Sequence, residues 1–126
     1  MGKLEGLKKR WEFVRVYSSG RSLANEKAVI YWFENELPVT RVGFSVSKKV
    51  GNAVVRNRLR RLFREAFRLY ADKVQPGVDI VFVVRRSAVG SNFHDIENAV
   101  SRLITRADLW TNSAKGNYKG VPVSKE

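Results

Sequence analysis

The stretch SKKVGNAVVRNRLRRLFREAFRLY, residues Ser47–Tyr70, combines a dense positive charge with regularly spaced apolar residues. It holds eight Lys or Arg residues and a single acid, Glu65. Asn52 is a residue type that favours the N-cap of a helix. The apolar residues that follow it at helical spacing are Val55, Leu59, Leu62, Phe63, Ala66, Phe67 and Tyr70. At about 100° per residue these seven share one side, so the stretch predicts an amphipathic helix packed against a sheet.

The arginines of this predicted helix lie mainly on its other side, and we call them the arginine strip. The strip consists of Arg56, Arg58, Arg60, Arg61, Arg64 and Arg68. Four of them follow one another at i, i+4 spacing, where like charges repel by a few tenths of a kcal/mol per pair. A helix side that only faces water usually interleaves acids, whereas a bound polyanion relieves the repulsion and counterion release drives its binding. The strip therefore favours nucleic-acid binding over a solvated surface.

The composition of the whole chain agrees with a folded, basic protein. Its 126 residues include 24 Lys or Arg against 12 Asp or Glu, for a formal charge of +12, and 44% are hydrophobic. Such a charge favours nucleic acid or an anionic membrane as partner. The longest apolar run, Ala28–Phe33, is far too short to span a bilayer, so no membrane partner is expected. The N-terminus has no signal-like segment and the chain has no cysteine, which suits the cytoplasm.

Alternating and β-branched residues predict strands, and two further periodic stretches predict helices. The predicted strands are Ala28–Phe33, Arg41–Ser47 and Val78–Val84. A short helix over Lys8–Ser18 is expected to end near Gly20, and Asn92 is expected to cap a helix that reaches Ala107. This order of elements indicates an α+β, two-layer sandwich. We expect one domain over residues 1–109 and a disordered polar tail over 110–126.

The first predicted helix carries apolar residues on two sides. Phe13 and Tyr17 are i, i+4 neighbours, while Leu7, Trp11 and Val14 point elsewhere. Such a helix either is deeply buried or presents aromatic rings to a ligand, and the residues alone leave both open. Aromatic rings that stack on bases tolerate any nucleotide sequence.

The acids are too scattered to predict a nuclease site of the protein's own. Two-metal hydrolysis of a phosphodiester needs carboxylates that hold ions about 4 Å apart. Asp72 and Asp79 are expected to bracket a turn, and Asp95 and Glu97 lie near a helix start, where they suit the helix dipole. His94 is the only histidine, so no paired-histidine mechanism is available. We expect neither catalytic residues nor metal ligands in the protein itself.

Two long motifs resemble one known family. RVGFSVSKKVGNAVVRNRLRRLFREAFR, residues 41–68, contains an Arg-Asn-Arg core at Arg56-Asn57-Arg58 and is similar to the signature region of the bacterial ribonuclease P protein component. Upstream, EFVRVYSSGRSLANEKAVIYWF, residues 12–33, resembles the family's N-terminal half, in which an aromatic pair precedes a glycine. The resemblance spans residues 7–104.

The resemblance implies a subunit of an endoribonuclease holoenzyme in which the RNA is the catalyst. The expected partners are ribonuclease P RNA and precursor tRNA, with one protein per RNA and no DNA. The reaction would remove the 5′ leader of precursor tRNA, with Mg²⁺ held mainly by the RNA. The family fold is ribosomal-protein-like, with about three helices and a mixed four-stranded sheet that has a left-handed crossover.

Site residues carry over from the family position by position. Those implied to face the catalytic RNA are Lys48, Lys49, Asn52, Arg56, Asn57, Arg58, Arg60, Arg61, Arg64 and Arg68. Those implied to bind the single-stranded leader in a cleft are Phe13, Tyr17 and Tyr31. The family more often has Phe where Tyr17 stands, and a phenol ring still offers a stacking face.

Two other functions fit part of the pattern. A ribosomal-type RNA binder would need the arginine strip but no leader cleft. A DNA-binding regulator would read the major groove with the same helix, but Asn57 is the only residue there suited to a bidentate adenine contact.

Overall fold

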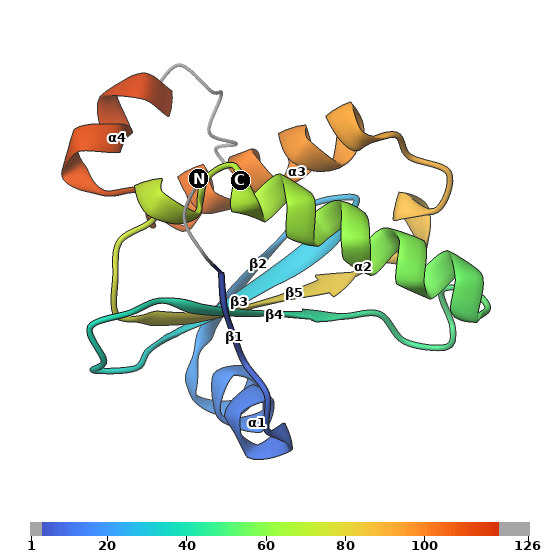
Figure 1. Ribbon diagram of the computed structural model, residues 1–126, viewed down its shortest axis with the longest axis horizontal. Helices are drawn as coiled ribbons and strands as arrows, with labels where there is room; N and C mark the ends of the chain where they lie inside the picture. Colours follow the sequence, from blue (N-terminus) through green and yellow to red (C-terminus); the bar gives the residue numbers. More distant parts are fainter. Residues whose placement is uncertain (1–3, 119–126) are drawn as a thin grey trace.

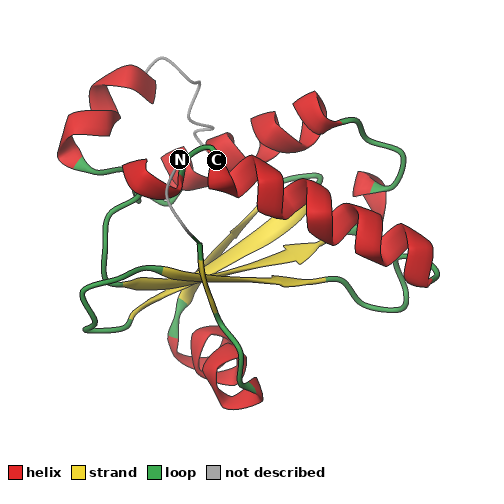
Figure 2. Cartoon of the chain, in the orientation of Figure 1, coloured by secondary structure: helices red, strands yellow, loops and turns green. Residues whose placement is uncertain are grey.

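The protein is a five-stranded mixed sheet with helices on both faces (Figures 1 and 2). The computed structural model describes residues 4–118. The elements are β1 (Glu5–Gly6), α1 (Arg10–Ser19), β2 (Arg21–Ala24), β3 (Ala28–Glu34), β4 (Arg41–Ser45), α2 (Ala53–Arg68), β5 (Val78–Val84), α3 (Phe93–Arg106) and α4 (Asn112–Tyr118), with short 3₁₀ turns at Ala71–Lys73 and Arg86–Ala88. The strand order is β1-β4-β5-β3-β2.

The main core lies between the sheet and the helices α2 and α3. Phe82 of β5 is fully buried, and its ring lies 6.2 Å from that of Phe63 and 5.8 Å from that of Phe67, both on α2. Ile96, Val100, Leu103 and Ile104 of α3 are fully buried in the same core. The amphipathic helix predicted from the sequence is confirmed, and its apolar side is the one that faces the sheet.

Helix α1 packs on the opposite face of the sheet (Figure 1). Val16 of α1 and Val81 of β5 are fully buried there and form a small cluster with Leu7. With ten residues, α1 is a short helix, and on its face Tyr31 and Val83 stay partly exposed at the edge of this cluster. The α1 face of the sheet is therefore incompletely covered.

The sheet has five strands rather than the four expected, and two of them, β1 and β2, are short. β1 pairs in parallel with β4 over two residue pairs, and β2 pairs antiparallel with β3 over four. β4 and β5 are parallel neighbours joined through α2, so the crossover implied by the family resemblance is present. The handedness of that crossover stays a prediction.

The expectation of a disordered tail from residue 110 is wrong for its first part. Trp110 is only 3% exposed. Its backbone forms an isolated antiparallel β-bridge with Val74, and the centre of its ring lies 5.4 Å from that of Tyr70. Helix α4 follows, with Ala114 buried. The folded part thus extends beyond residue 109, and residues 119–126 of the expected tail lie outside the described residues. Within the described part, no helix is long and apolar enough to cross a membrane.

Candidate RNA interface

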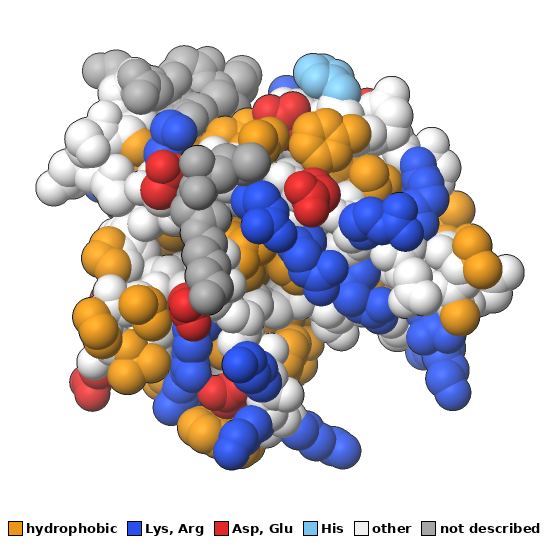
Figure 3. Space-filling view, in the orientation of Figure 1, with side chains coloured by type: hydrophobic (Ala, Val, Ile, Leu, Met, Phe, Trp, Pro, Cys, Tyr) orange, Lys and Arg blue, Asp and Glu red, His pale blue; other side chains and the backbone are white. Residues whose placement is uncertain are grey.

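The arginine strip runs along the side of α2 that faces away from the sheet (Figure 3). Asn52 caps the helix as predicted, since its Oδ1 accepts a hydrogen bond of 3.0 Å from the backbone N–H of Val55. Leu59 and Phe63 are fully buried, whereas Arg61 and Arg64 are exposed. The helix therefore separates a buried apolar side from a cationic one, as its sequence requires.

Three arginines of α2 make hydrogen bonds to neutral acceptors. Arg56 donates from Nε to the carbonyl oxygen of Gly51 at 3.1 Å. Arg58 donates from Nη2 to the carbonyl oxygen of Ser91 at 3.0 Å. Arg60 donates from Nη1 to Oδ1 of Asn57 at 2.8 Å. These contacts orient the guanidinium groups without cancelling their charge.

Acids do little to neutralise the strip. Among the described side chains, its one ion pair joins Arg68 Nε to Glu65 Oε1 at 3.7 Å, between partly exposed groups. An ion pair of that length between surface groups contributes little to stability. Arg64 instead places its guanidinium 5.7 Å from the ring centre of Phe44. The strip thus keeps most of its positive charge available to a partner.

The loop before α2 holds Lys48 and Lys49, both exposed. A turn in this loop is closed by the backbone hydrogen bond from Val50 N to Ser47 O, at 3.1 Å. Arg86, which the sequence interpretation did not assign to the site, donates from Nε to the carbonyl oxygen of Lys49 at 3.3 Å. The loop is thereby tied to the turn that follows β5, next to the N-terminus of α2.

The three aromatic residues implied for leader binding come together on the α1 face. The rings of Tyr17 on α1 and Tyr31 on β3 meet edge to face, with centres 5.0 Å apart. Phe13 and Tyr31 both pack against the small cluster around Val16. Tyr17 is 37% exposed, and the other two are partly exposed. Ring surface therefore remains accessible beside the incompletely covered sheet.

Of the second apolar side expected for this helix, Leu7 is buried, but Trp11 and Val14 are not. Trp11 is 56% exposed and Val14 is 49% exposed. The indole of Trp11 instead covers Arg15, whose guanidinium carbon lies 5.1 Å from the ring centre of Trp11 and 5.0 Å from that of Phe33. Stacking on a guanidinium gives an exposed tryptophan a structural role.

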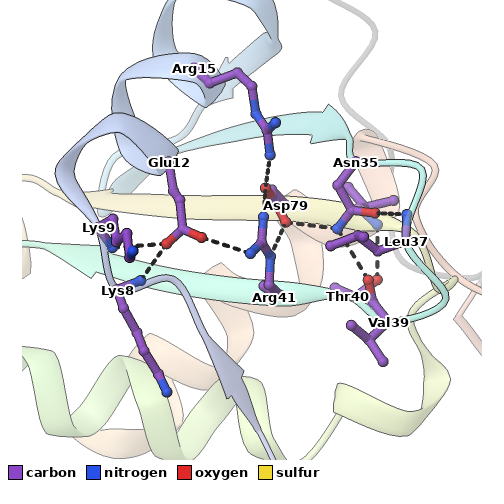
Figure 4. A network of polar contacts seen from close by, with 11 residues as sticks. Lys8, Lys9, Glu12, Arg15, Asn35, Leu37, Val39, Thr40, Arg41 and Asp79 are labelled. Atoms are coloured by element: carbon purple, nitrogen blue, oxygen red, sulfur yellow. Dashed lines mark hydrogen bonds and ion pairs between the residues drawn. The ribbon is translucent and has the colours of Figure 1, made fainter.

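A buried charge network fixes α1 to the sheet (Figure 4). Asp79 on β5 is completely buried. Arg41 on β4 forms a bidentate pair with it, Nε to Oδ1 at 2.9 Å and Nη2 to Oδ2 at 2.8 Å. Arg15 of α1 donates to Oδ2 at 3.1 Å, and Asn35 donates to Oδ1 at 2.7 Å. Two guanidinium groups and an amide thus satisfy one buried carboxylate.

Glu12 connects the same network to the start of α1. Its Oε2 accepts a hydrogen bond of 2.7 Å from Nη1 of Arg41, and its Oε1 accepts bonds of 2.8 Å from the backbone N–H groups of Lys8 and Lys9. Glu12 therefore satisfies free backbone N–H groups at the start of α1 and also binds Arg41 of the sheet.

The network keeps both of its carboxyl groups ionised. Burial by itself would raise the pKa of Asp79, but the hydrogen bonds accepted from two arginines and an asparagine outweigh it, so this pKa lies below its ordinary value. Backbone hydrogen bonds, first from Lys9 and then from Lys8, lower the pKa of Glu12, and the Arg41 charge adds to them against burial. Each carboxylate is therefore anionic at neutral pH.

Asp79 follows the bend at residues 76–77, as expected, but the sequence analysis missed its role: it lies inside β5 and forms ion pairs with Arg41 of β4 and Arg15 of α1. The signal was present in the sequence, where one acid interrupts the otherwise apolar run VDIVFVV. A charge at a position covered on both faces requires a partner of opposite charge. What the sequence could not supply was the identity of that partner.

No group of three or more His, Cys, Asp or Glu residues suited to a metal ion occurs in the described part of the chain. The lone histidine, His94, is exposed at the start of α3. The chemistry that the arrangement offers is cationic and aromatic, which suits RNA.

Comparisons with known proteins identify the family. The family model for ribonuclease P matches residues 1–108. The chain belongs to the ribonuclease P protein family. The ribonuclease P protein component of Thermoanaerobacter sp. (strain X514) is 46% identical over 113 residues, covering 90% of this chain and 97% of that protein. That of Clostridioides difficile (strain 630) is 48% identical over 108 residues, covering 85% and 95%.

Solved ribonuclease P proteins share the fold. The protein from Staphylococcus aureus superposes with a TM-score of 0.79 at 34% identity, covering 86% of this chain and all of that one. The protein from Thermotoga maritima gives a TM-score of 0.74 at 31% identity, covering 81% and 96%. The resemblance seen in the sequence is thereby confirmed, and the chain is a protein subunit of ribonuclease P, an endoribonuclease holoenzyme with an RNA partner.

Proposed function

We propose that this subunit binds the catalytic RNA of ribonuclease P through the arginine strip and the loop before it. The observation that carries the proposal is the pattern of charge on α2. Three of its arginines are oriented by neutral acceptors, and one long contact with Glu65 is the sole ion pair of the strip among the described side chains. Planar guanidinium groups grip phosphates in bidentate fashion and stack on bases. Docking on RNA relieves the repulsion between them.

In this proposal the ring surfaces of Phe13, Tyr17 and Tyr31 bind the single-stranded 5′ leader of precursor tRNA. Their partly exposed rings, the Tyr17–Tyr31 contact and the uncovered sheet beside α1 support it. Stacking that ignores base identity suits leaders of varied sequence. The protein thus assists endonucleolytic removal of the leader in tRNA maturation, in the cytoplasm, as one copy per RNA.

Mg²⁺ serves the reaction as an ion held mainly by the RNA. The described part of the protein offers no cluster of carboxylates for it. The contribution of the protein is to bring positive charge between two RNAs and to position the substrate.

The deciding experiment is precursor-tRNA cleavage by the partner RNA at low Mg²⁺, with and without this protein. We expect cleavage to depend on the protein at low Mg²⁺ and to become independent of it as Mg²⁺ rises. Equal rates with and without the protein at low Mg²⁺ would contradict the proposal.

A second measurement separates leader binding from RNA binding of the ribosomal type. The reconstituted particle should bind precursor tRNA more tightly than mature tRNA. Equal affinities would leave the strip as the sole RNA contact. Tight site-specific binding to duplex DNA would instead favour the regulator hypothesis.

A further inference from the structure

A glycine in the middle of β4 lies beneath the ring of Phe13. Gly43 is buried, and its neighbours Val42 and Phe44 pack on the side of the main core, so position 43 faces α1. A Cβ built on Gly43 would lie only 2.6 Å from Cε2 and Cζ of Phe13, closer than non-bonded carbon atoms can approach. Glycine inside a strand often marks such a close approach. The ring of Phe13 therefore occupies the space that a side chain at position 43 would fill.

The same row of the sheet holds another of the aromatic residues implied for leader binding. Gly43 pairs with Val81 of β5, which pairs with Tyr31 of β3. Across this row the side chains grow from none, through a fully buried valine, to the tyrosine ring that meets Tyr17. Phe13 thus fills the low end of the row, and Tyr31 forms the high end. The size of residue 43 sets how deeply the ring of Phe13 can lie beside the other two rings.

Helix α1 is tied to the sheet on both sides of Phe13. Glu12 accepts a hydrogen bond of 2.7 Å from Nη1 of Arg41 on β4. Arg15 donates a hydrogen bond of 3.1 Å to the buried carboxylate on β5. Because these contacts hold the backbone of α1, a methyl group on the glycine beneath the ring would displace the ring and not the helix. Phe13 is only partly buried, so its ring has solvent to turn into.

We propose that Gly43 is a positioning residue for leader binding: it leaves room for the ring of Phe13 and so holds that ring at the depth at which it stacks on a base of the leader. This inference rests on the proposed leader binding by Phe13, Tyr17 and Tyr31. Gly43 acts through Phe13 and needs no contact with RNA of its own. A binding side chain must be held close to its productive geometry by the residues packed around it, so a ring that is raised or turned loses its stacking contact.

The test replaces the glycine by the smallest side chain. Gly43→Ala should weaken binding of precursor tRNA to the holoenzyme by roughly 5- to 100-fold, the loss of stacking on one base. The affinities for mature tRNA and for the catalytic RNA should not change, and KM should rise while kcat at saturating substrate stays the same. Gly6→Ala is the matched control, because Gly6 lies opposite Val42 on β1 and a Cβ added there meets nothing closer than 3.9 Å.

A double-mutant cycle shows whether Gly43 acts through the ring. In a Phe13→Ala background, Gly43→Ala should cause no further loss of affinity for precursor tRNA, since the ring that the methyl group displaces is gone. A further loss in that background would overturn the proposal, and so would a Gly43→Ala protein that keeps the wild-type preference for precursor over mature tRNA. Failure of the proposed function would appear differently, because Phe13→Ala itself would then leave that preference unchanged.

The same double variant covers the case in which Gly43→Ala alone does not fold. Without the ring of Phe13, the nearest atom to the added methyl group is Cδ1 of Leu7, at 3.4 Å. The double variant should therefore unfold at the same temperature as Phe13→Ala and bind precursor tRNA equally well. A double variant that stays unfolded, or that binds precursor tRNA more weakly than Phe13→Ala, would refute the assignment, because the methyl group would then act on something other than the ring.

Discussion

Arginine plays opposite roles in two regions of this molecule. On α2, exposed Arg61 and Arg64 have no carboxylate partner among the described residues. Beneath α1, Arg41 is held by Asp79 and Glu12 at 2.7–2.9 Å, and its side chain is only 17% exposed. The same charged group is left largely unneutralised on α2, where we propose that it binds RNA, and forms internal ion pairs beneath α1. What distinguishes them is where the chain places its few acids.

The largest expected effect, on the free energy of unfolding, comes from removing Asp79, the acid at the centre of the buried charge network. Asp79→Ala leaves the partly buried Arg15 without a carboxylate and Arg41 with Glu12 alone, and breaking a buried pair in this way typically costs about 3–5 kcal/mol. Urea unfolding should show a loss of this size. Asp72→Ala, which removes an exposed acid 3.9 Å from Lys73, should change the unfolding free energy by less than about 0.5 kcal/mol. Equal effects of the two substitutions would mean that the network does not hold α1.

Acid should weaken the same region. The pKa values of Asp79 and Glu12 are lower in the folded chain than in the unfolded one, so their contribution is complete above the unfolded values near 4. It is lost as pH falls through the folded values, because the unfolded state then binds more protons. Unfolding free energies measured from pH 7 to pH 2 should fall steeply at the acid end. An Asp79→Asn, Glu12→Gln double variant should start lower and fall less, and a parallel decline would contradict the assignment.

The aromatic residues of α1 and β3 should give an intermediate effect, on binding. Phe13→Ala should reduce the affinity of the holoenzyme for precursor tRNA by roughly 1–3 kcal/mol while leaving the affinity for mature tRNA unchanged. Val14→Ala, at an exposed position of the same helix, is the control. If Phe13→Ala instead lowers the thermal unfolding midpoint with leader affinity intact, the ring belongs to the core.

The two regions also differ in how far the sequence predicts them. The apolar side of α2 and its Asn52 cap follow from spacing within one segment, so both are predictable. The pair of Arg41 and Asp79 joins residues 38 apart in the chain, and only the pairing of β4 with β5 brings them together. Local pattern shows that Asp79 needs a partner but cannot choose among 24 basic residues.

Short elements escape prediction for a related reason. β1 has two residues and β2 has four, too few for a recognisable alternation, and both form by pairing with longer strands. The segment after Trp110 is polar and contains Gly116, yet α4 forms next to a tryptophan buried against Tyr70 and Val74. Of the site, the strip and the aromatic set could be placed on α1, α2 and β3 from sequence and family resemblance, whereas the ion pairs of Asp79 required the fold.

The most direct test of the distinction between the two arginine regions is the salt dependence of binding to the catalytic RNA. Arg64→Ala should reduce the slope of log K against log salt by about one unit, and combined replacement of Arg60, Arg61 and Arg64 by about three, with the fold intact. Arg102→Ala, an exposed arginine of α3 outside the strip, should leave the slope unchanged. A slope that the triple replacement does not alter would show that α2 merely faces water, and the account would fail.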